Sequence, residues 1–267
     1  MAGPDGWTTV VGLHWIDQET TTLGTAPESD LVLPPGSAPA RVGILRRQGA
    51  QLLFQPLVQP EVRVRGRPQG EDPPARILPH DDDGRAVPEV VESGRLRWWI
   101  LRRGDRLAVR VKDPEAPARR RFPGLPCFPW DSRWRLEARL EAAEPGSTHP
   151  IRDLTGLTRQ EPLAGRLIFS REGRQHRLLA LADRPAGDLF ILFRDQTSGR
   201  ETYGPGRFLH VPLPGASGRT WVDFNRAYHP PCAFTAYATC PRPPAENSLA
   251  LRVTAGERSD RGGEHST

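Results

Sequence analysis

The residues of this chain that could do chemistry gather in one segment near the C-terminus, from Trp221 to Asn247. The segment holds several prolines and two cysteines, so it cannot be regular secondary structure along its length. Long irregular loops are uncommon in compact domains and are usually functional. The segment therefore predicts a functional site. Its residues match no known reaction signature, so they locate a site without identifying a reaction or a substrate.

Three side chains of this loop form a candidate metal site. Cys232 follows three positions after His229, and Cys240 follows eight positions after Cys232. Imidazole and thiolate are the ligands that zinc prefers, and three protein ligands with one water make a catalytic geometry. Zinc is therefore the candidate cofactor, although the spacing matches no zinc ribbon and no deaminase pattern.

Other roles for the two cysteines stay open. Cys232 and Cys240 could form a disulfide, or they could pack as small buried hydrophobes, which is the commonest fate of intracellular cysteine. Nucleophilic catalysis by Cys232 is a further reading, which requires His229 or His210 as a base within hydrogen-bond reach.

Seven further polar side chains lie at predicted strand ends and turns, where a barrel or sandwich presents its ligand contacts. They are Asp195, Glu201, Tyr203, Arg207, Asp223, Asn225 and Tyr228. Arg207 could clamp an anionic ligand in bidentate fashion, and a desolvated carboxylate could run acid–base chemistry. A structural role is the alternative, in which Arg207 bridges Asp195 or Glu201, because buried polar groups need partners. Asp223 and Asn225 could likewise cap the long loop.

These residues support three functional hypotheses. The leading one is that the C-terminal domain binds a small anionic ligand through the seven side chains. The second is a hydrolase-like enzyme that uses carboxylates, or the His and Cys metal site, in the same loop. The third is a protein-interaction or structural module without a small-molecule site, which predicts an exposed aromatic patch. That patch would be formed by Trp98, Trp99, Trp130 and Trp134.

Composition argues against several classes of protein. The chain has 267 residues and a net charge of +5, but its basic residues are interleaved with acidic ones, so we expect no nucleic-acid partner. No apolar run reaches the roughly 18 residues of a membrane span, and the N-terminus shows no signal-peptide pattern. The three cysteines do not make a disulfide scaffold, so we expect a cytoplasmic protein without a membrane partner. No oligomeric state follows from the residues.

The 26 glycines and 29 prolines interrupt the chain too often for long helices, so we expect an all-β fold. Residues 1–113 are predicted to form a β-sandwich. Its expected strands are Trp7–Trp15, Arg41–Arg47, Gln51–Gln55 and Glu61–Arg65, with a hairpin over Arg95–Asp113 that turns at Gly104 and Asp105. Residues 114–133 read as a Pro-rich connector.

Residues 134–258 are predicted to form an antiparallel β-barrel or sandwich, against which the N-terminal sandwich packs. The stretch Trp134–Ala142 alternates apolar and charged residues with a period of two, which favours a strand, with a helix as the open alternative. The other expected strands are Arg166–Ser170, Gln175–Ala182, Asp188–Asp195, Arg207–Leu213, Thr220–Phe224 and Leu249–Ala255. Residues 259–267 are expected to be a disordered tail.

The N-terminal stretch from Leu23 to Gly43 resembles the start of a forkhead-associated domain. Gly24, Asp30 and Ser37 fit that family's pattern, and the dipeptide Arg65-Gly66 stands where the family has Asn-Gly. The resemblance covers residues 1–113 and implies a β-sandwich.

Two departures from that family bear on phosphopeptide binding. Thr25 stands where the family has an arginine, and Ala40 stands where it has a histidine. Recognition of a phosphate dianion needs charge-assisted donors of this kind. We therefore expect a scaffold of this type without phosphopeptide binding.

Two longer motifs carry a second resemblance. Residues 193–207 have the form FxDxTSGxETYGxGR, and residues 223–247 have the form DFNxAYNPPCAxxxYxTCPxPPxEN, except that His229 stands where Asn is usual. Both resemble the bacterial and archaeal family known as domain of unknown function 1684, and the segments VGLHW and LVLP extend the resemblance over nearly the whole chain. The family's name records no activity, so the resemblance implies no reaction and no ligand. An Asn at position 229 would be a poor metal ligand.

Overall fold

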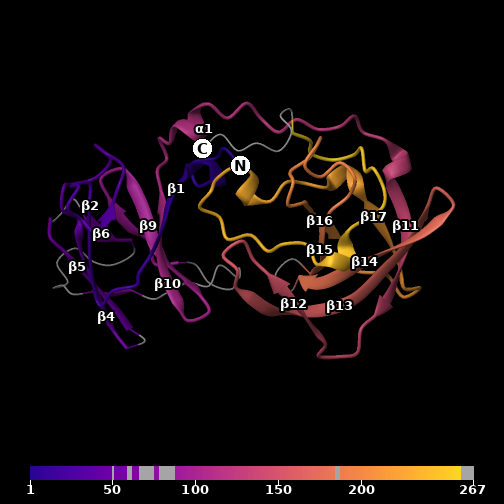
Figure 1. Cartoon of the computed structure of the whole chain (residues 1–267), viewed down its shortest axis with the longest axis horizontal. Coiled ribbons are helices and arrows are strands. Elements are labelled where there is room, and N and C mark those ends of the chain that lie inside the picture. Colours follow the sequence, from indigo (N-terminus) through magenta and orange to yellow (C-terminus); the bar gives the residue numbers. More distant parts are fainter. Residues whose placement is uncertain (50, 59–61, 66–74, 78–87, 184–186, 260–267) are drawn as a thin grey trace. The chain divides into compact units, whose positions relative to one another are not determined.

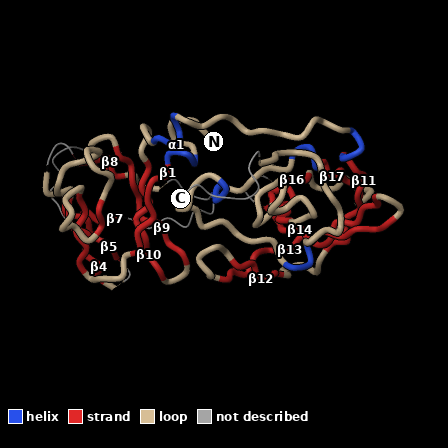
Figure 2. Tube along the Cα trace, turned by 45° about the horizontal axis from the view of Figure 1, so that its top comes forward, coloured by secondary structure: helices blue, strands red, loops and turns tan. Residues whose placement is uncertain are grey.

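The computed structural model describes the chain except for residues 50, 59–61, 66–74, 78–87, 184–186 and 260–267 (Figure 1). Strands dominate the described residues, and helices are confined to short turns (Figure 2). The prediction of an all-β fold is confirmed. None of the helices in the described ranges is long and apolar enough to cross a membrane.

The chain divides into two compact units, Met1–Phe122 and Pro123–Thr267. The division falls within residues 114–133, the stretch expected to be a connector. This stretch contains the short helix α1 (Pro117–Arg120) and ends in a 3-10 turn, η2 (Ser132–Trp134). Each unit has a hydrophobic core of its own.

The first unit contains two five-stranded sheets. In order across the first sheet, the strands are β1 (Val10–Trp15), β10 (Arg106–Lys112), β9 (Leu96–Arg103), β8 (Val91–Ser93) and β6 (Val62–Val64). In order across the second sheet, they are β3 (Leu31–Val32), β2 (Thr20–Gly24), β4 (Gly43–Gln48), β5 (Gln51–Pro56) and β7 (Ala75–Ile77). One core cluster draws its residues from both sheets, and the edge of Trp98 packs on Phe54 there with ring centroids 4.9 Å apart.

Most of the strands predicted in the first unit are present. The hairpin over Arg95–Asp113 is confirmed as β9 and β10, which pair in register across Gly104 and Asp105. The strand expected from Trp7 begins only at Val10, because Trp7–Thr9 forms a 3-10 turn, η1. Glu61 lies outside the described residues, and β6 follows it. The resemblance to a forkhead-associated domain stays a prediction.

The second unit is built around one curled antiparallel sheet. Its strands in order are β16 (Arg207–Val211), β15 (Asp188–Phe193), β14 (Arg174–Asp183), β13 (Thr158–Arg171), β11 (Arg135–Ala142) and β17 (Arg219–Asp223). A further strand, β12 (Thr148–Arg152), pairs with β13 and was not predicted. The strand interpretation of 134–142 is confirmed, since β11 pairs with β13 on one side and β17 on the other.

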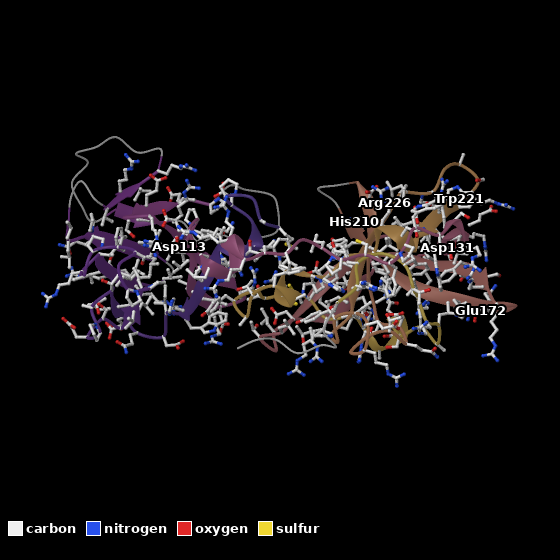
Figure 3. All side chains as sticks on the ribbon, turned by 90° about the horizontal axis from the view of Figure 1, so that it is seen from above. Asp113, Asp131, Glu172, His210, Trp221 and Arg226 are labelled. Carbon is white, nitrogen blue, oxygen red and sulfur yellow. The ribbon has the colours of Figure 1, made fainter. Side chains whose placement is uncertain are left out.

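The turn between β13 and β14 shows how local sequence sets strand register. Glu172 and Gly173 both have positive φ, at 53° and 70°, and Glu172 lies at the tip of the hairpin (Figure 3). Two successive residues with positive φ make a turn whose twist matches that of the flanking strands. The pairing therefore begins directly at Arg171 and Arg174.

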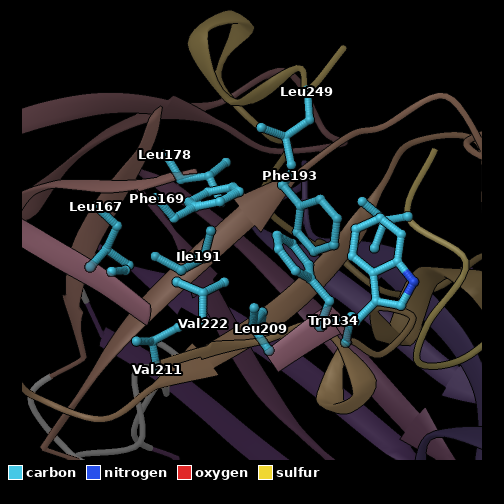
Figure 4. Packing of buried hydrophobic residues seen from close by; sticks show 14 of the residues in the cluster. Trp134, Leu167, Phe169, Leu178, Ile191, Phe193, Leu209, Val211, Val222 and Leu249 are labelled. Carbon is cyan, nitrogen blue, oxygen red and sulfur yellow. The ribbon is translucent and has the colours of Figure 1, made fainter. Parts of the chain in front are cut away.

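The core of the second unit lies on the concave face of this sheet (Figure 4). Alternate residues of the strands supply it, among them Leu167, Ile191 and Leu209, which are fully buried. Phe193 and Phe224 meet edge to face at its end, with centroids 5.4 Å apart. The period of two along each strand thus places every second residue in one continuous core.

The segment expected to be a last strand, Leu249–Ala255, is not one. It forms an irregular strap that we call the C-terminal strap, residues 249–259. Its residues Leu249, Leu251, Val253 and Ala255 are buried in the core, so the alternating pattern is real. The prediction of a strand was wrong because alternation indicates only that every second side chain is buried. It does not indicate whether the backbone pairs with a neighbouring strand.

Candidate functional site

Arg207 begins β16 and is fully buried. Its guanidinium donates hydrogen bonds to three carbonyl oxygens of the C-terminal strap: Nη2 to Val253 at 2.9 Å, Nη1 to Ala255, and Nη1 to Glu257 at 3.3 Å. The guanidinium also lies over the ring of Phe193, 5.3 Å from its centroid. Arg207 thus supplies the strap with hydrogen bonds that a neighbouring strand would otherwise make.

Asp195 lies beside Arg207 and is also buried. Its Oδ1 is 3.5 Å from Nη2 of Arg207, and its Oδ2 accepts the backbone N–H of Val253 at 2.8 Å. The hydroxyl of Thr197 donates to the same carboxylate at 2.9 Å. Asp195 therefore closes its own turn, holds the strap and partly neutralises Arg207.

One donor of Arg207 has no partner within the described ranges. Its Nε is buried and makes no hydrogen bond there. Burial lowers the pKa of Arg207, and the nearby Asp195 carboxylate opposes that effect. A buried unsatisfied donor on a charged group is uncommon in folded proteins and calls for an explanation.

Next to Arg207, a chain of hydrogen bonds joins Glu257, His229 and Tyr203. The backbone N–H of His229 donates to Oε2 of Glu257 at 2.7 Å, and the ring Nε2 of His229 accepts the backbone N–H of Tyr203 at 3.3 Å. The hydroxyl of Tyr203 donates to the carbonyl oxygen of Cys232 at 3.1 Å. The side chain of Glu257 is 14% exposed, so the chain of bonds leads from solvent into the interior.

The ionisable side chains joined by these hydrogen bonds, those of Glu257, His229 and Tyr203, have shifted pKa values. Burial, together with the positive charge of Arg207, lowers the pKa of His229 to about 4. The imidazole is therefore neutral at pH 7, and because Nε2 accepts a hydrogen bond, its proton lies on Nδ1. Burial also raises the pKa of Glu257 and that of Tyr203. Shifted pKa values that gather at one place are typical of functional sites.

Cys232 and Cys240 lie against each other and both are buried. The backbone N–H of Cys232 donates to Sγ of Cys240 at 3.3 Å. A hydrogen bond from the Cys240 thiol lowers the pKa of Cys232, an effect that burial opposes. The two cysteines are thiols and are not joined by a disulfide.

The predicted zinc ligands are not arranged as a metal site. The ring Nε2 of His229 already accepts the Tyr203 N–H. Across the residues that the structure describes, no group of three His, Cys, Asp or Glu side chains could hold a metal ion. Zinc is therefore not carried into the proposed function.

Asp223 and Asn225, both predicted ligand contacts, lie together and bond to each other and to Asp131. Oδ1 of Asp223 accepts the backbone N–H and the side-chain N–H of Asn225, at 3.1 and 2.9 Å. The Asn225 carboxamide also bonds both backbone groups of Asp131, which is labelled in Figure 3. The pair fixes the start of the second unit to the turn after β17.

The other two predicted contacts, Glu201 and Tyr228, also have partners of their own. Glu201 forms an exposed ion pair with Arg252 at 2.7 Å. Tyr228 lies flat against His210, with its hydroxyl 3.0 Å from the ring Nε2. The side chains described around Arg207 are those of Asp195, Tyr203, His229 and Glu257, and we call them with Arg207 the cluster around Arg207. Of the seven predicted ligand residues, Asp195, Tyr203 and Arg207 belong to this cluster and the other four do not.

Two residues of the site region were missed as contributors. Glu257 lies in a segment without periodicity, and no sequence signal marks it. Asn247 ends the long loop, and its carboxamide bonds the backbone N–H and carbonyl of Leu179 and the carbonyl of Leu192 at 2.7 to 2.9 Å. A buried Asn directly after a proline-rich segment is the signal that could have marked it.

The aromatic patch predicted for an interaction module is not a surface feature. Trp98, Trp99 and Trp134 are buried, and only Trp130 is exposed, at 72%. The prediction was wrong for these three tryptophans because each lies in a strand or turn that faces a core or a basic side chain. Arg171, for example, lies 4.5 Å over the ring of Trp134.

Comparison with known proteins agrees with the second motif resemblance. Residues 120–258 match the model of a family described as Protein of unknown function (DUF1684). Among solved structures, the chain is similar to an uncharacterized protein of Haloarcula marismortui that was determined by solution NMR. The two sequences are 33% identical, the match covers 55% of this chain and 83% of that chain, and the TM-score is 0.45. No curated protein matches the chain. The family match spans the whole cluster around Arg207.

Proposed function

We propose that this chain, which belongs to the DUF1684 family of proteins of unknown function, binds a small molecule with an anionic group through its second unit. The site is the Arg207 cluster, which we define as Asp195, Tyr203, Arg207, His229 and Glu257. Arg207 and Tyr203 would contact the ligand, and Asp195 would position Arg207. Glu201, Asp223, Asn225 and Tyr228 are left out because their polar groups bond elsewhere in the chain.

The observation that carries the proposal is the Nε donor of Arg207. The guanidinium is fully buried, and although the carboxylates of Asp195, at 3.5 Å, and of Glu257 act on its charge, its Nε has no partner in the described part of the chain. A buried donor that is left without an acceptor costs about 1 to 3 kcal/mol, and more on a charged group. An anionic oxygen of a ligand would satisfy Nε with a charge-assisted hydrogen bond.

The charges of the cluster predict how binding depends on pH. A ligand anion at Arg207 would lie close to the carboxylate of Glu257, and burial already raises the pKa of that group. The anion would raise this pKa further, so binding would take up a proton at Glu257. We therefore expect affinity to increase as the pH falls from about 8 to about 5.

Isothermal titration calorimetry of the full chain with acetate, succinate, citrate and inorganic phosphate tests the proposal. The key variant is Glu257→Gln, which removes the negative charge while its amide oxygen can still accept the His229 N–H. We expect this variant to bind the favoured anion about tenfold more tightly at neutral pH, a gain of about 1.4 kcal/mol, and to lose the pH dependence. Glu201→Gln is the matched control, since Glu201 pairs with Arg252 outside the cluster, and it should bind as the wild type does.

Two outcomes would overturn the proposal. One is that none of the four anions binds at any pH in this range and native mass spectrometry of the purified chain detects no retained small molecule. The other is that an anion binds but Glu257→Gln and Glu201→Gln change its affinity equally, because the ligand would then respond to overall charge and not to the cluster.

A further inference from the structure

We propose that Cys232 and Cys240 form a redox-active dithiol, which low-molecular-weight disulfides oxidise to an intramolecular disulfide. The inference does not require ligand binding, although Tyr203 of the Arg207 cluster also anchors Cys232. It begins from the contact between the two residues: the backbone N–H of Cys232 donates to Sγ of Cys240 at 3.3 Å, and the Cys240 thiol is within hydrogen-bond reach of the Cys232 side chain. Such a contact already places the sulfur atoms side by side, as disulfide formation requires.

Separate elements of the second unit hold the two cysteines in place. The carbonyl oxygen of Cys232 accepts the hydroxyl of Tyr203 at 3.1 Å, and the carbonyl oxygen of Cys240 accepts the backbone N–H of Leu154 at 3.0 Å. Leu154 lies in the hairpin between β12 and β13, and Asp153 in that hairpin bridges to Pro241. The pair is therefore brought together by the fold and not by chance proximity along a flexible loop.

The surrounding groups give the two sulfurs different roles. The hydrogen bond from Cys240 lowers the pKa of the Cys232 thiol, which favours Cys232 as the attacking thiolate. The backbone N–H of Cys232 points at Sγ of Cys240, at 3.3 Å, and would stabilise negative charge on that sulfur in a second step. The arrangement thus provides an attacking and a resolving cysteine.

The exchange proceeds in two balanced steps. The Cys232 thiolate attacks one sulfur of the small disulfide, whose S–S bond breaks, and the leaving thiolate takes up the proton that Cys232 released. Cys240 then loses its proton and attacks Sγ of Cys232, and a second small thiol leaves. Overall the two cysteines lose two hydrogen atoms and form one S–S bond, while the small disulfide is reduced to two thiols.

Burial sets the class of oxidant. Cys232 and Cys240 are only 4% and 5% exposed, whereas Tyr237 on the intervening segment is 39% exposed. A reagent as small as cystamine or glutathione disulfide can reach the pair after a local opening of this segment, whereas a folded protein partner has no direct access. We therefore expect slow oxidation by small disulfides, on a time scale set by that opening.

The test uses the full chain with the substitution Cys127→Ser, which removes the exposed third cysteine. After incubation with glutathione disulfide under native conditions, intact mass should show the loss of two hydrogen atoms, and peptide mapping should join Cys232 to Cys240. Dithiothreitol should restore the mass. The oxidised form should melt about 5 °C higher than the reduced form, because the new bond restricts the unfolded chain.

Single substitutions separate this proposal from ordinary thiol chemistry. With Cys127→Ser and Cys240→Ser combined, Cys232 should stop at a mixed disulfide with glutathione, and the gain in melting temperature should vanish. The proposal is overturned if the Cys127→Ser chain keeps both thiols after prolonged exposure to glutathione disulfide. It is also overturned if a stable mixed disulfide accumulates on either cysteine while the other is still present.

Discussion

Two groups of polar residues in the second unit use their hydrogen bonds in different ways. Arg207 bonds mainly to backbone carbonyls of the C-terminal strap, Asp195 bonds the strap, its own turn and Arg207, and Asn247 bonds the backbone of the sheet. His229 and Glu257, by contrast, belong to a chain of ionisable groups whose pKa values are shifted by burial. The first group replaces absent strand pairing, whereas the second group holds protons whose loss or gain changes the charge of the interior.

The difference teaches why polar motifs are ambiguous. Both groups consist of buried polar side chains within or beside the two motifs, and sequence alone shows only the residue types. What separates them is not the kind of partner, since His229 and Glu257 also accept backbone N–H groups, but an imidazole and a carboxylate whose pKa values are shifted. Side chains of both groups have a role in folding, and an imidazole or carboxylate with a shifted pKa can in addition respond to pH.

Replacing Arg207 with Ala should give the largest effect and would test the first group directly. The substitution removes the donors to the carbonyls of Val253 and Ala255 and leaves the Asp195 carboxylate buried without its cation. Breaking a buried ion pair by removing one partner costs about 4 kcal/mol. We expect the free energy of unfolding to fall by about that amount in urea denaturation followed by tryptophan fluorescence.

Arg219→Ala is the matched control for this prediction. Arg219 also pairs with a carboxylate, that of Glu137, but its side chain is 67% exposed. An exposed pair contributes about 0 to 1 kcal/mol. If Arg207→Ala destabilised the chain no more than Arg219→Ala does, the structural role of Arg207 would be refuted and the residue could be assigned wholly to ligand binding.

How much of the fold could be predicted depended on the kind of signal each segment carried. The turn residues Gly104 and Asp105 and the strict alternation in 134–142 report local geometry, and both predictions are confirmed. The segment 249–255 has the same alternation and forms no strand, because pairing depends on a neighbouring backbone that is distant in sequence. Sequence periodicity therefore located the buried face of each segment better than it located the sheet edges.

The candidate site was predictable only where its residues lie within the two sequence motifs. The spacing of the motifs marked Arg207 and Asp195, and the structural alternative considered for them, a bridge between the two, corresponds to the 3.5 Å contact. Glu257 gave no signal, because its place in the cluster comes from the path of the C-terminal strap and not from its neighbours in sequence. Residue type and spacing alone predict a metal site at His229, and its partners in the structure are Tyr203 and Glu257.

A smaller effect is expected for Asn247→Ala, which tests whether one carboxamide replaces strand pairing. The pairing of β14 with β15 ends at Leu181 and Phe190. Two positions further along each strand, the carboxamide of Asn247 bonds both Leu179 and Leu192. The substitution leaves three buried backbone groups without their partner, at about 1 kcal/mol or more each. We expect a loss of about 3 kcal/mol in the same urea experiment, whereas the exposed neighbour Glu246→Ala should cost less than about 0.5 kcal/mol. Equal effects of the two substitutions would contradict this role.

The smallest effect concerns the second group and is a dependence on pH. The pKa of His229 is lowered from 6.5 to about 4 in the folded chain, so in the pH range between these values the unfolded chain binds a proton that the folded chain does not. His229 therefore lowers the stability progressively as the pH falls from about 6.5 toward 4, by about 2 kcal/mol between pH 7 and pH 5. The raised pKa of Glu257 acts in the opposite direction, since protonation of that group favours the folded chain at low pH.

The variant His229→Asn separates these two contributions. It removes the titrating imidazole and keeps Glu257. Urea denaturation at a series of pH values should show that the wild type loses about 2 kcal/mol more than the variant between pH 7 and pH 5. Parallel curves for the two proteins would mean that His229 has an ordinary pKa in the folded chain. The chain of hydrogen bonds from Glu257 to Tyr203 would then be structural, like the contacts of Arg207, and the distinction between the two groups would disappear.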